Sequence, residues 1–227
     1  MKPKICVSLS SADPHELRRQ ARRAEALSAD LVEVRLDRLD NSQGISRIAE
    51  AVKIPLVATN RPVYEKGSFA GPENERLNLL MNAVEKGAHY VDLESSTSNL
   101  DEVIKTFRKT SAKIILSHHD YSRTPKLSSL RSTFTKLQKK RSDIYKIVTT
   151  ARTPEDNLTV LGLLKTNDEA TPLVSFAMGK PGVWSRLLAP FYGSQFTYAS
   201  LQRGLETAPG QPSISELRQV YQMLCSD

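Results

Sequence analysis

Two adjacent histidines and an aspartate follow an apolar run in the segment KIILSHHDYSRTP, residues 113–125. An imidazole is a candidate general acid or base because its ordinary pKa, about 6.5, lies close to neutral pH. The same side chains could equally be ordinary polar residues at the end of a strand. Which role the histidines have therefore depends on where the two rings lie relative to other polar side chains.

A single lysine, Lys146, stands between aliphatic residues in the run IYKIVT, residues 144–149. A charged side chain in the middle of a buried strand is costly unless its ammonium group is paired or neutral. One interpretation is a lysine that reaches solvent or pairs with a neighbour such as Glu94. The other is a neutral amine, favoured by burial near Arg35 and Arg186, that attacks a ketone to form a Schiff base.

These residues belong to a series of eight strand-like runs, each followed by a loop and a helix-like pattern. Such alternation indicates parallel βα units. Eight units in 227 residues predict one (β/α)₈ barrel domain, an α/β fold spanning residues 1–227. A doubly wound open sheet is the alternative, but no GxGxxG motif follows the first run. The eight runs cover residues 5–9, 31–36, 55–59, 90–94, 113–118, 144–149, 172–177 and 196–200.

Several helix starts are signalled by capping residues. A Thr or Asp before a proline offers a side-chain oxygen to the first helical turn, whose backbone angle the proline already has. A Ser followed three residues later by Glu is typical of a capping box. The predicted starts are at Asp13-Pro14, Thr124-Pro125, Thr153-Pro154 and the pair Ser213 and Glu216.

Strand parity predicts which polar side chains point into the barrel, because successive strand residues face opposite sides. In LVEVRL, Glu33 and Arg35 share one face, so we expect them to point inward as an ion pair. A two-layer sheet with that face in water is the alternative. The same argument places His119 at the mouth of the lumen and turns His118 outward. Lys146 belongs to the next strand, which in a barrel lies directly beside the strand of His119.

Composition narrows the classes of function. Lys plus Arg exceed Asp plus Glu by 32 − 25 = 7, and hydrophobic residues make up 39% of the chain. The basic runs RRQARR (18–23) and KKR (139–141) lie in helix-like patterns without interleaved aromatic residues. They are typical of a solvated helix face, so a nucleic-acid partner is not expected.

The two cysteines, Cys6 and Cys225, lie at opposite ends of the sequence and outside any CxxC or Cys/His cluster. Reduced thiols in a cytoplasmic protein are therefore expected, with no zinc site. The start MKPKICVSLS is interpreted as a first strand rather than a signal peptide, and no apolar run is long enough to span a membrane.

Six motifs, in this order and at these spacings, resemble the type I 3-dehydroquinate dehydratase family. The resemblance covers nearly the whole chain and implies a (β/α)₈ barrel that works in the cytoplasm in the shikimate pathway, with no metal or organic cofactor. It also implies the small molecule 3-dehydroquinate as substrate, no nucleic-acid or membrane partner, and is compatible with a homodimer. The motifs are EVRLD (33–37), TNRPVYEKG (59–67), SHHDYSRTP (117–125), IYKIV (144–148), MGKPGVWSR (178–186) and APGQP (208–212).

Position by position, the resemblance implies that Lys146 forms a Schiff base with the substrate ketone and that His119 is the general acid and base. Glu65 would orient and charge-balance His119, and Arg186 would bind the substrate carboxylate. The remaining residues expected to bind substrate or order the site are Glu33, Arg35, Arg61, Gln211, Ser8 and Thr207, of which Thr207 stands where the family usually has serine in a mobile lid, about residues 201–212.

Two rival functions keep some of these features. A class I aldolase would share the lysine but break a C–C bond, and its phosphate site would use glycines such as Gly182 and Gly210. A basic nucleic-acid-binding module would use the net charge and would lose affinity for DNA as salt rises. The buried lysine favours the enzyme.

Overall fold

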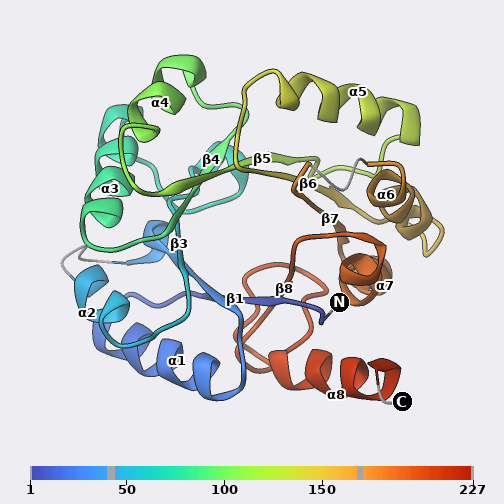
Figure 1. Ribbon diagram of the computed structural model, residues 1–227, viewed down its shortest axis with the longest axis horizontal. Helices are drawn as coiled ribbons and strands as arrows, with labels where there is room; N and C mark the ends of the chain where they lie inside the picture. The colour runs from blue at the N-terminus through green and yellow to red at the C-terminus, as the bar shows by residue number, and fades with distance from the viewer. Residues whose placement is uncertain (1, 40–43, 168–170, 226–227) are drawn as a thin grey trace.

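The computed structural model describes residues 2–39, 44–167 and 171–225, in which strands and helices alternate along the chain. Figure 1 shows the strands enclosed by an outer ring of helices. The strands are β1 Ile5–Leu9, β2 Leu31–Arg35, β3 Leu56–Thr59, β4 Tyr90–Glu94, β5 Lys113–His119, β6 Ile144–Thr150, β7 Leu173–Met178 and β8 Thr197–Ala199. The α-helices are α1 Pro14–Ala26, α2 Ile45–Ala49, α3 Glu73–Glu85, α4 Leu100–Phe107, α5 Leu127–Gln138, α6 Asp156–Lys165, α7 Val183–Leu188 and α8 Ile214–Cys225. The described 3₁₀ turns are η1 Leu36–Arg38, η3 Val63–Glu65, η4 Lys180–Gly182 and η5 Ala189–Tyr192.

All paired strands are parallel, and they form one eight-stranded sheet in the order β7-β6-β5-β4-β3-β2-β1-β8. The sheet curves until β8 comes back beside β7. No ladder joins these two strands in the described residues, but the amide of Gln195 donates to the carbonyl of Leu173 at 2.9 Å. The predicted (β/α)₈ barrel is confirmed, and the doubly wound open sheet is excluded.

Two apolar cores follow from the alternation of side chains along the strands. The larger core lies between the sheet and the helices, where strand residues such as Val32 and Leu116 pack with helix residues such as Leu17. The smaller core fills the lumen and includes Cys6, Ile115, Val174 and Phe176. Burial of each such aliphatic or aromatic side chain contributes about 1.5–3 kcal/mol. The lumen is therefore packed at one end, and only its other end is left for polar chemistry.

Two of the four predicted helix starts are confirmed. The Asp13 side chain accepts the amide of His15 at the start of α1, and Ser213 and Glu216 exchange the two hydrogen bonds of a capping box at α8. The predictions at Thr124 and Thr153 are wrong.

Helix α5 begins only at Leu127, because the Thr124 hydroxyl is engaged with Thr149 and with the carbonyl of Thr150 at the end of β6. Helix α6 begins at Asp156, whose carboxylate accepts the Thr153 amide at 3.1 Å. In neither case does the predicted threonine side chain cap its helix.

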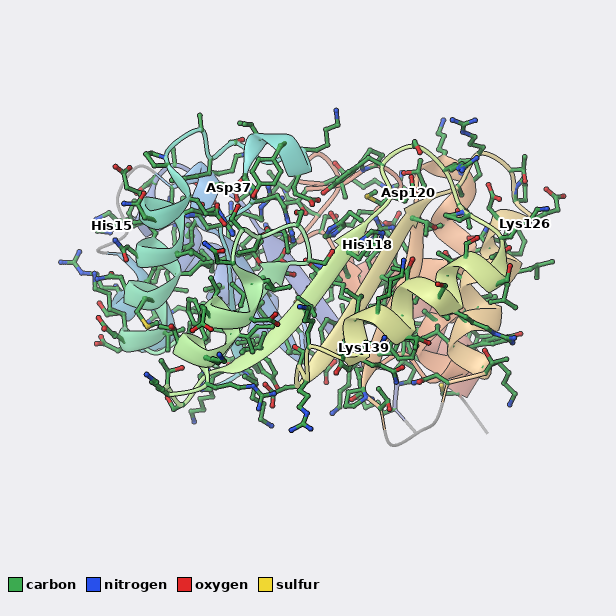
Figure 2. All side chains as sticks on the ribbon, turned by 90° about the horizontal axis from the view of Figure 1, so that it is seen from above. His15, Asp37, His118, Asp120, Lys126 and Lys139 are labelled. Carbon is green, nitrogen blue, oxygen red and sulfur yellow. The ribbon has the colours of Figure 1, made fainter. Side chains whose placement is uncertain are left out.

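The basic helical runs lie on the outside of the barrel. Arg22 and Arg23 are exposed on α1, while Gln20 and Ala21 beside them are buried. Lys139, labelled in Figure 2 just beyond the end of α5, is exposed, and Lys140 pairs with Asp101 on α4. Among the described helices, none is long and apolar enough to cross a membrane.

Candidate active site

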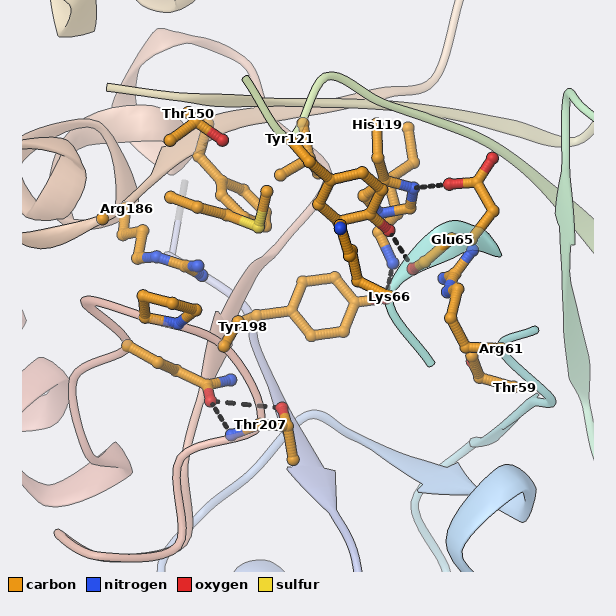
Figure 3. A pocket seen from close by; sticks show the side chains of 18 of the residues that line it. Thr59, Arg61, Glu65, Lys66, His119, Tyr121, Thr150, Arg186, Tyr198 and Thr207 are labelled. Atoms are coloured by element: carbon orange, nitrogen blue, oxygen red, sulfur yellow. Dashed lines mark hydrogen bonds and ion pairs between the residues drawn. The ribbon is translucent and has the colours of Figure 1, made fainter. Parts of the chain in front are cut away.

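A cavity of about 340 Å³ opens at the carboxyl end of the strands (Figure 3). Nine of the ten residues expected in the site line it: Glu33, Arg35, Arg61, Glu65, His119, Lys146, Arg186, Thr207 and Gln211. The carboxyl end of the strands is where barrel enzymes place their active sites. Thr59, Lys66, Tyr121, Val148, Thr150, Phe176, Met178, Gly179, Tyr198, Ala208 and Pro209 complete the lining.

Ser8 does not line this cavity. It is buried in β1, and its hydroxyl donates to the carboxylate of Glu33, which also accepts the hydroxyl of Thr59 at 2.9 Å. The expected direct contact between Ser8 and the substrate therefore has no support in the geometry. Ser8 instead holds Glu33 in its inward position.

The expected inward orientation of Glu33 and Arg35 is found, but the ion pair between them is not. Arg35 donates to the carboxylate of Asp37 at 2.8 and 2.7 Å. The chain turns into η1 directly after β2, and this turn brings Asp37 back to the guanidinium group. Although burial opposes ionisation, Arg35 lowers the pKa of Asp37.

Lys146 is 4% exposed, and its amine reaches the lumen from β6. The Nζ atom lies 2.9 Å from Asp92 Oδ2, 3.2 Å from the Tyr198 hydroxyl and 3.9 Å from Glu33 Oε1. The sequence argument expected Arg35 and Arg186 to act on this amine, with Glu94 as the alternative partner. That expectation is wrong, because the nearest charged groups are carboxylates and Glu94 is occupied elsewhere.

A network of buried ion pairs occupies the β3, β4 and β5 side of the cavity. Arg61 lies 3.0 Å from Asp92 and 2.7 Å from Glu94, and Arg76 from α3 contacts Glu94 at 2.7 Å. The Ser117 hydroxyl also donates to Asp92. Burial favours the neutral form of Asp92, but Arg61 and Lys146 hold the pKa of this carboxyl below its ordinary value. Every charge in this network therefore has a partner.

His119 lines the cavity from the end of β5, whereas the ring of His118 lies beside the Ser95 hydroxyl at 3.2 Å. Burial lowers the pKa of His119 well below 6.5, and the nearby cations Arg61 and Lys146 lower it further. The imidazole is consequently neutral at neutral pH and has a nitrogen that can accept a proton. Strand parity predicted these different positions of the two histidine rings.

Glu65 stands next to His119 without a hydrogen bond. Its Oε2 lies 3.8 Å from His119 Nδ1, an ion-pair contact (dashed in Figure 3) that is too long for a hydrogen bond. Both buried atoms lack a hydrogen-bond partner in the described part of the chain. Ser96 donates to the other carboxylate oxygen, and the Tyr121 hydroxyl donates to the Glu65 carbonyl. The Tyr121 ring also stacks on His119 with 5.4 Å between centroids.

Arg186, on α7, is 1% exposed and has no carboxylate partner among the described residues. Its Nε and Nη2 atoms make no hydrogen bond, and its guanidinium carbon lies 4.4 Å over the ring of Phe176. Burial lowers the pKa of Arg186 to about 9. A buried cation with free donors that face a cavity is suited to bind an anion.

The segment 201–212 closes one side of the cavity. Within it, the amide and hydroxyl of Thr207 donate to the side chain of Gln211 at 2.9 and 3.2 Å. Gly210 has φ +72, and a Cβ there would stand 2.2 Å from the Gly179 carbonyl, so only glycine fits. The Gly179 amide in turn donates to the Pro209 carbonyl. These contacts fasten the segment to the end of β7.

Two functional residues were missed by the sequence argument. Asp92 and Tyr198 both contact the amine of Lys146. The parity test that selected Glu33 would also have selected Asp92, which alternates with Val91 and Leu93 in β4. Tyr198 carried a weaker signal, since β8 has only three residues.

A polar cavity with a buried lysine at the carboxyl ends of eight parallel strands defines an α/β-barrel enzyme. Residues 5–227 match the family described as type I 3-dehydroquinase. A 3-dehydroquinate dehydratase of Dehalococcoides mccartyi is 37% identical over 219 residues, which are 96% of this chain and 95% of the relative. The chain belongs to the type I 3-dehydroquinase family, whose members are hydro-lyases.

Solved structures agree with this assignment. The 3-dehydroquinate dehydratase of Geobacillus kaustophilus has a TM-score of 0.90 at 25% identity and covers 100% of this chain and 93% of its own. A type I 3-dehydroquinate dehydratase of Clostridium difficile, solved with covalently modified comenic acid, has a TM-score of 0.88 at 26% identity and covers 98% and 92%.

Proposed function

We propose that residues 1–227 form one catalytic domain that removes water from 3-dehydroquinate to give 3-dehydroshikimate through a Schiff base on Lys146. The observation that carries this proposal is the shared cavity: the amine of Lys146, the neutral imidazole of His119 and the unpaired guanidinium of Arg186 all line it. Family membership supports the reaction, and the residue roles are argued from the geometry below.

Lys146 is the nucleophile in this proposal. Its amine condenses with the substrate ketone, and the resulting iminium withdraws electrons from the neighbouring C–H bond. The carboxylates of Asp92 and Glu33, 2.9 and 3.9 Å from Nζ, favour positive charge at this nitrogen. They therefore stabilise the iminium as they stabilise the ammonium. The covalently modified ligand in the Clostridium difficile relative is consistent with such chemistry on this fold.

His119 is the proton carrier. Its lowered pKa keeps the imidazole neutral, so it can accept the proton next to the iminium and then return it to the departing hydroxyl group. Glu65, 3.8 Å away, lies close enough to stabilise the imidazolium that forms between these two steps. A small movement of either side chain would complete a charge-assisted hydrogen bond.

Arg186 binds the substrate carboxylate. An arginine can form two parallel hydrogen bonds with a carboxylate, which fixes the orientation of the ring relative to His119. The hydroxyl groups of the substrate are left for the polar residues that line the rest of the cavity. Those are Glu33, Arg35, Arg61, Thr207 and Gln211.

The reaction is tested by mixing purified protein with 3-dehydroquinate and following the absorbance of the conjugated enone product. Borohydride added with substrate should leave a stable adduct on Lys146, located by mass spectrometry of the digested protein. An adduct on another lysine, or none, contradicts the proposal. An aldol cleavage product in place of the enone would instead support the class I aldolase alternative.

A pair of histidine variants separates the roles on β5. We expect His119→Ala to abolish turnover while the Lys146 adduct still forms. His118→Ala should retain most activity, because its ring contacts Ser95 outside the cavity. A larger loss in the His118 variant would contradict the assignment.

The resemblance also supports a cytoplasmic protein that needs no metal, organic cofactor, nucleic acid or membrane. Assembly into a homodimer remains an expectation from the resemblance, and sedimentation against the 25.3 kDa chain mass tests it.

A further inference from the structure

Tyr198 is placed to act on the amine of Lys146. Its hydroxyl lies 3.2 Å from Nζ, and the amine also sits 4.4 Å from the centre of its ring. The residue is 4% exposed, and its side chain forms part of the cavity wall (Figure 3). Packing against Phe176 and Phe196 fixes the ring. The phenol therefore occupies a defined position beside the nitrogen on which the proposed chemistry depends.

The other group within hydrogen-bond distance of Nζ cannot supply a proton. Asp92 accepts hydrogen bonds from Lys146, Arg61 and Ser117, and the cations Arg61 and Lys146 keep it ionised. Burial raises the pKa of Tyr198, and the negative charge of Glu33 raises it further, so the phenol keeps its proton. The phenol oxygen accepts from Nζ, and no described residue accepts its own hydrogen. Among the described partners of the amine, only Tyr198 can both take and give a proton.

We propose that Tyr198 is a further catalytic residue, which relays protons from the Lys146 nitrogen to the substrate ketone oxygen during formation of the imine. The inference rests on the proposed Schiff-base function. A ketone carbon bonded to Nζ carries its oxygen only two bonds from that nitrogen. A hydroxyl group that already contacts Nζ is thus within reach of both atoms.

The relay is balanced without an external acid or base. The ammonium of Lys146 holds three protons, of which two leave with the ketone oxygen as water and one stays on the iminium nitrogen. In the first transfer the phenol accepts a proton from nitrogen and gives its own to the ketone oxygen as the N–C bond forms. In the second transfer the phenol accepts another proton from nitrogen and gives its own to the new hydroxyl group. The C–O bond then breaks, its electron pair leaves with water, and the freed nitrogen lone pair forms the C=N bond. Tyr198 is a neutral phenol again after each transfer.

The test compares Tyr198→Phe with the unchanged protein in a single turnover that is quenched with borohydride at successive times. General acid–base catalysis contributes about 10²–10⁴-fold, and water can replace part of it, so we expect adduct formation on Lys146 to slow about tenfold or more. With substrate deuterated at the carbon that loses its proton, the isotope effect on turnover should fall toward one, because imine formation becomes the slow step.

Tyr145→Phe is the matched control. Tyr145 is the neighbour of Lys146 on β6, is 5% exposed, and its hydroxyl bonds the Ser142 amide and the Gln138 carbonyl outside the cavity. It should lose comparable stability in thermal unfolding and form the adduct at the unchanged rate.

Adduct formation in Tyr198→Phe within twofold of the unchanged protein would overturn the relay. An unchanged protein that gives no Lys146 adduct would overturn the Schiff-base proposal instead, so the two failures are distinguishable. If Tyr198→Phe does not fold, 3-fluorotyrosine at position 198 keeps ring and hydroxyl but changes proton affinity. It should shift the trapping rate threefold or more, and an unchanged rate would count against the relay.

Discussion

Arg61 and Arg186 are both buried arginines that line the same cavity, on opposite sides in Figure 3, yet their surroundings differ completely. Arg61 contacts the carboxylates of Asp92 and Glu94 as well as Ser117. The guanidinium group of Arg186 lies over the face of Phe176, and two of its nitrogens have no hydrogen-bond partner among the described residues. The guanidinium group of Arg61 is paired within the protein, whereas that of Arg186 has donors available to a ligand.

The difference teaches that burial of charge has two uses in one site. A fully paired network fixes Lys146 and the β3–β5 wall, and removal of Arg61 would take a cation away from two buried carboxylates, Asp92 and Glu94. A buried, unpaired guanidinium group lowers the stability of the free protein. Binding of an anion to that group offsets this loss. Loss of Arg61 should therefore lower stability, whereas loss of Arg186 should lower substrate binding with little change in stability.

The largest effect is expected for Arg61→Met. The substitution keeps the approximate shape of the side chain but leaves Asp92 and Glu94 without their shared partner, so the free energy of unfolding should fall by about 3–5 kcal/mol. Urea unfolding followed by circular dichroism measures this loss. A change below about 1 kcal/mol would show that the network does not stabilise the barrel.

Arg186→Met should change binding rather than stability. The free energy of unfolding should stay within about 1 kcal/mol of the unchanged protein or rise, since a buried unpaired charge is removed. The kcat/KM for 3-dehydroquinate should fall about 100-fold, equivalent to about 2.7 kcal/mol for two charge-assisted hydrogen bonds. A large loss of stability with a normal KM would contradict the distinction drawn between the two arginines.

Arg186→Lys sharpens the same comparison. Lysine keeps the positive charge but cannot form the planar pair of bonds to a carboxylate. We expect kcat/KM to recover only in part and to remain about tenfold below the unchanged protein, or about 1.4 kcal/mol. Full recovery would mean that charge alone, without the guanidinium geometry, binds the substrate.

The smallest expected effect is a pH dependence of stability from His119. Its folded-state pKa lies well below the unfolded value of about 6.5, so the unfolded chain binds a proton that the folded chain does not. Stability should therefore fall as pH decreases below about 6.5, by at most about 1.4 kcal/mol per pH unit. Unfolding experiments from pH 7 to 5 should show a shallower slope in His119→Gln, and an equal slope would contradict this origin.

Much of this arrangement was predictable from the sequence. Eight alternations of strand and helix patterns fixed the barrel, because a parallel strand buried on both sides has few other environments. Parity then selected the inward side chains of Glu33, Lys146 and His119, since this rule depends only on the strand being extended.

The remainder depended on contacts between segments far apart in the sequence. The partner of Arg35 is Asp37 because η1 turns back at the end of β2, and that turn has no proline or glycine to announce it. The partner of Lys146 was misjudged because Arg61 and Arg76 occupy Glu94, so the lysine contacts Asp92 instead. Contacts between side chains of different elements, and the geometry of loops, follow from packing, which a single strand pattern does not encode.

The meeting of β7 and β8 has a consequence for how this barrel comes apart. One amide–carbonyl bond spans that gap in the described chain. Tyr198 lies on β8, and Arg186 lies on α7 in the connection between the two strands. On heating, β7 and β8 should separate first, which would widen the ligand cavity before the other strand pairs unfold. Catalytic activity should thus be lost at a lower temperature than helical content. An anion bound by Arg186 should raise both temperatures.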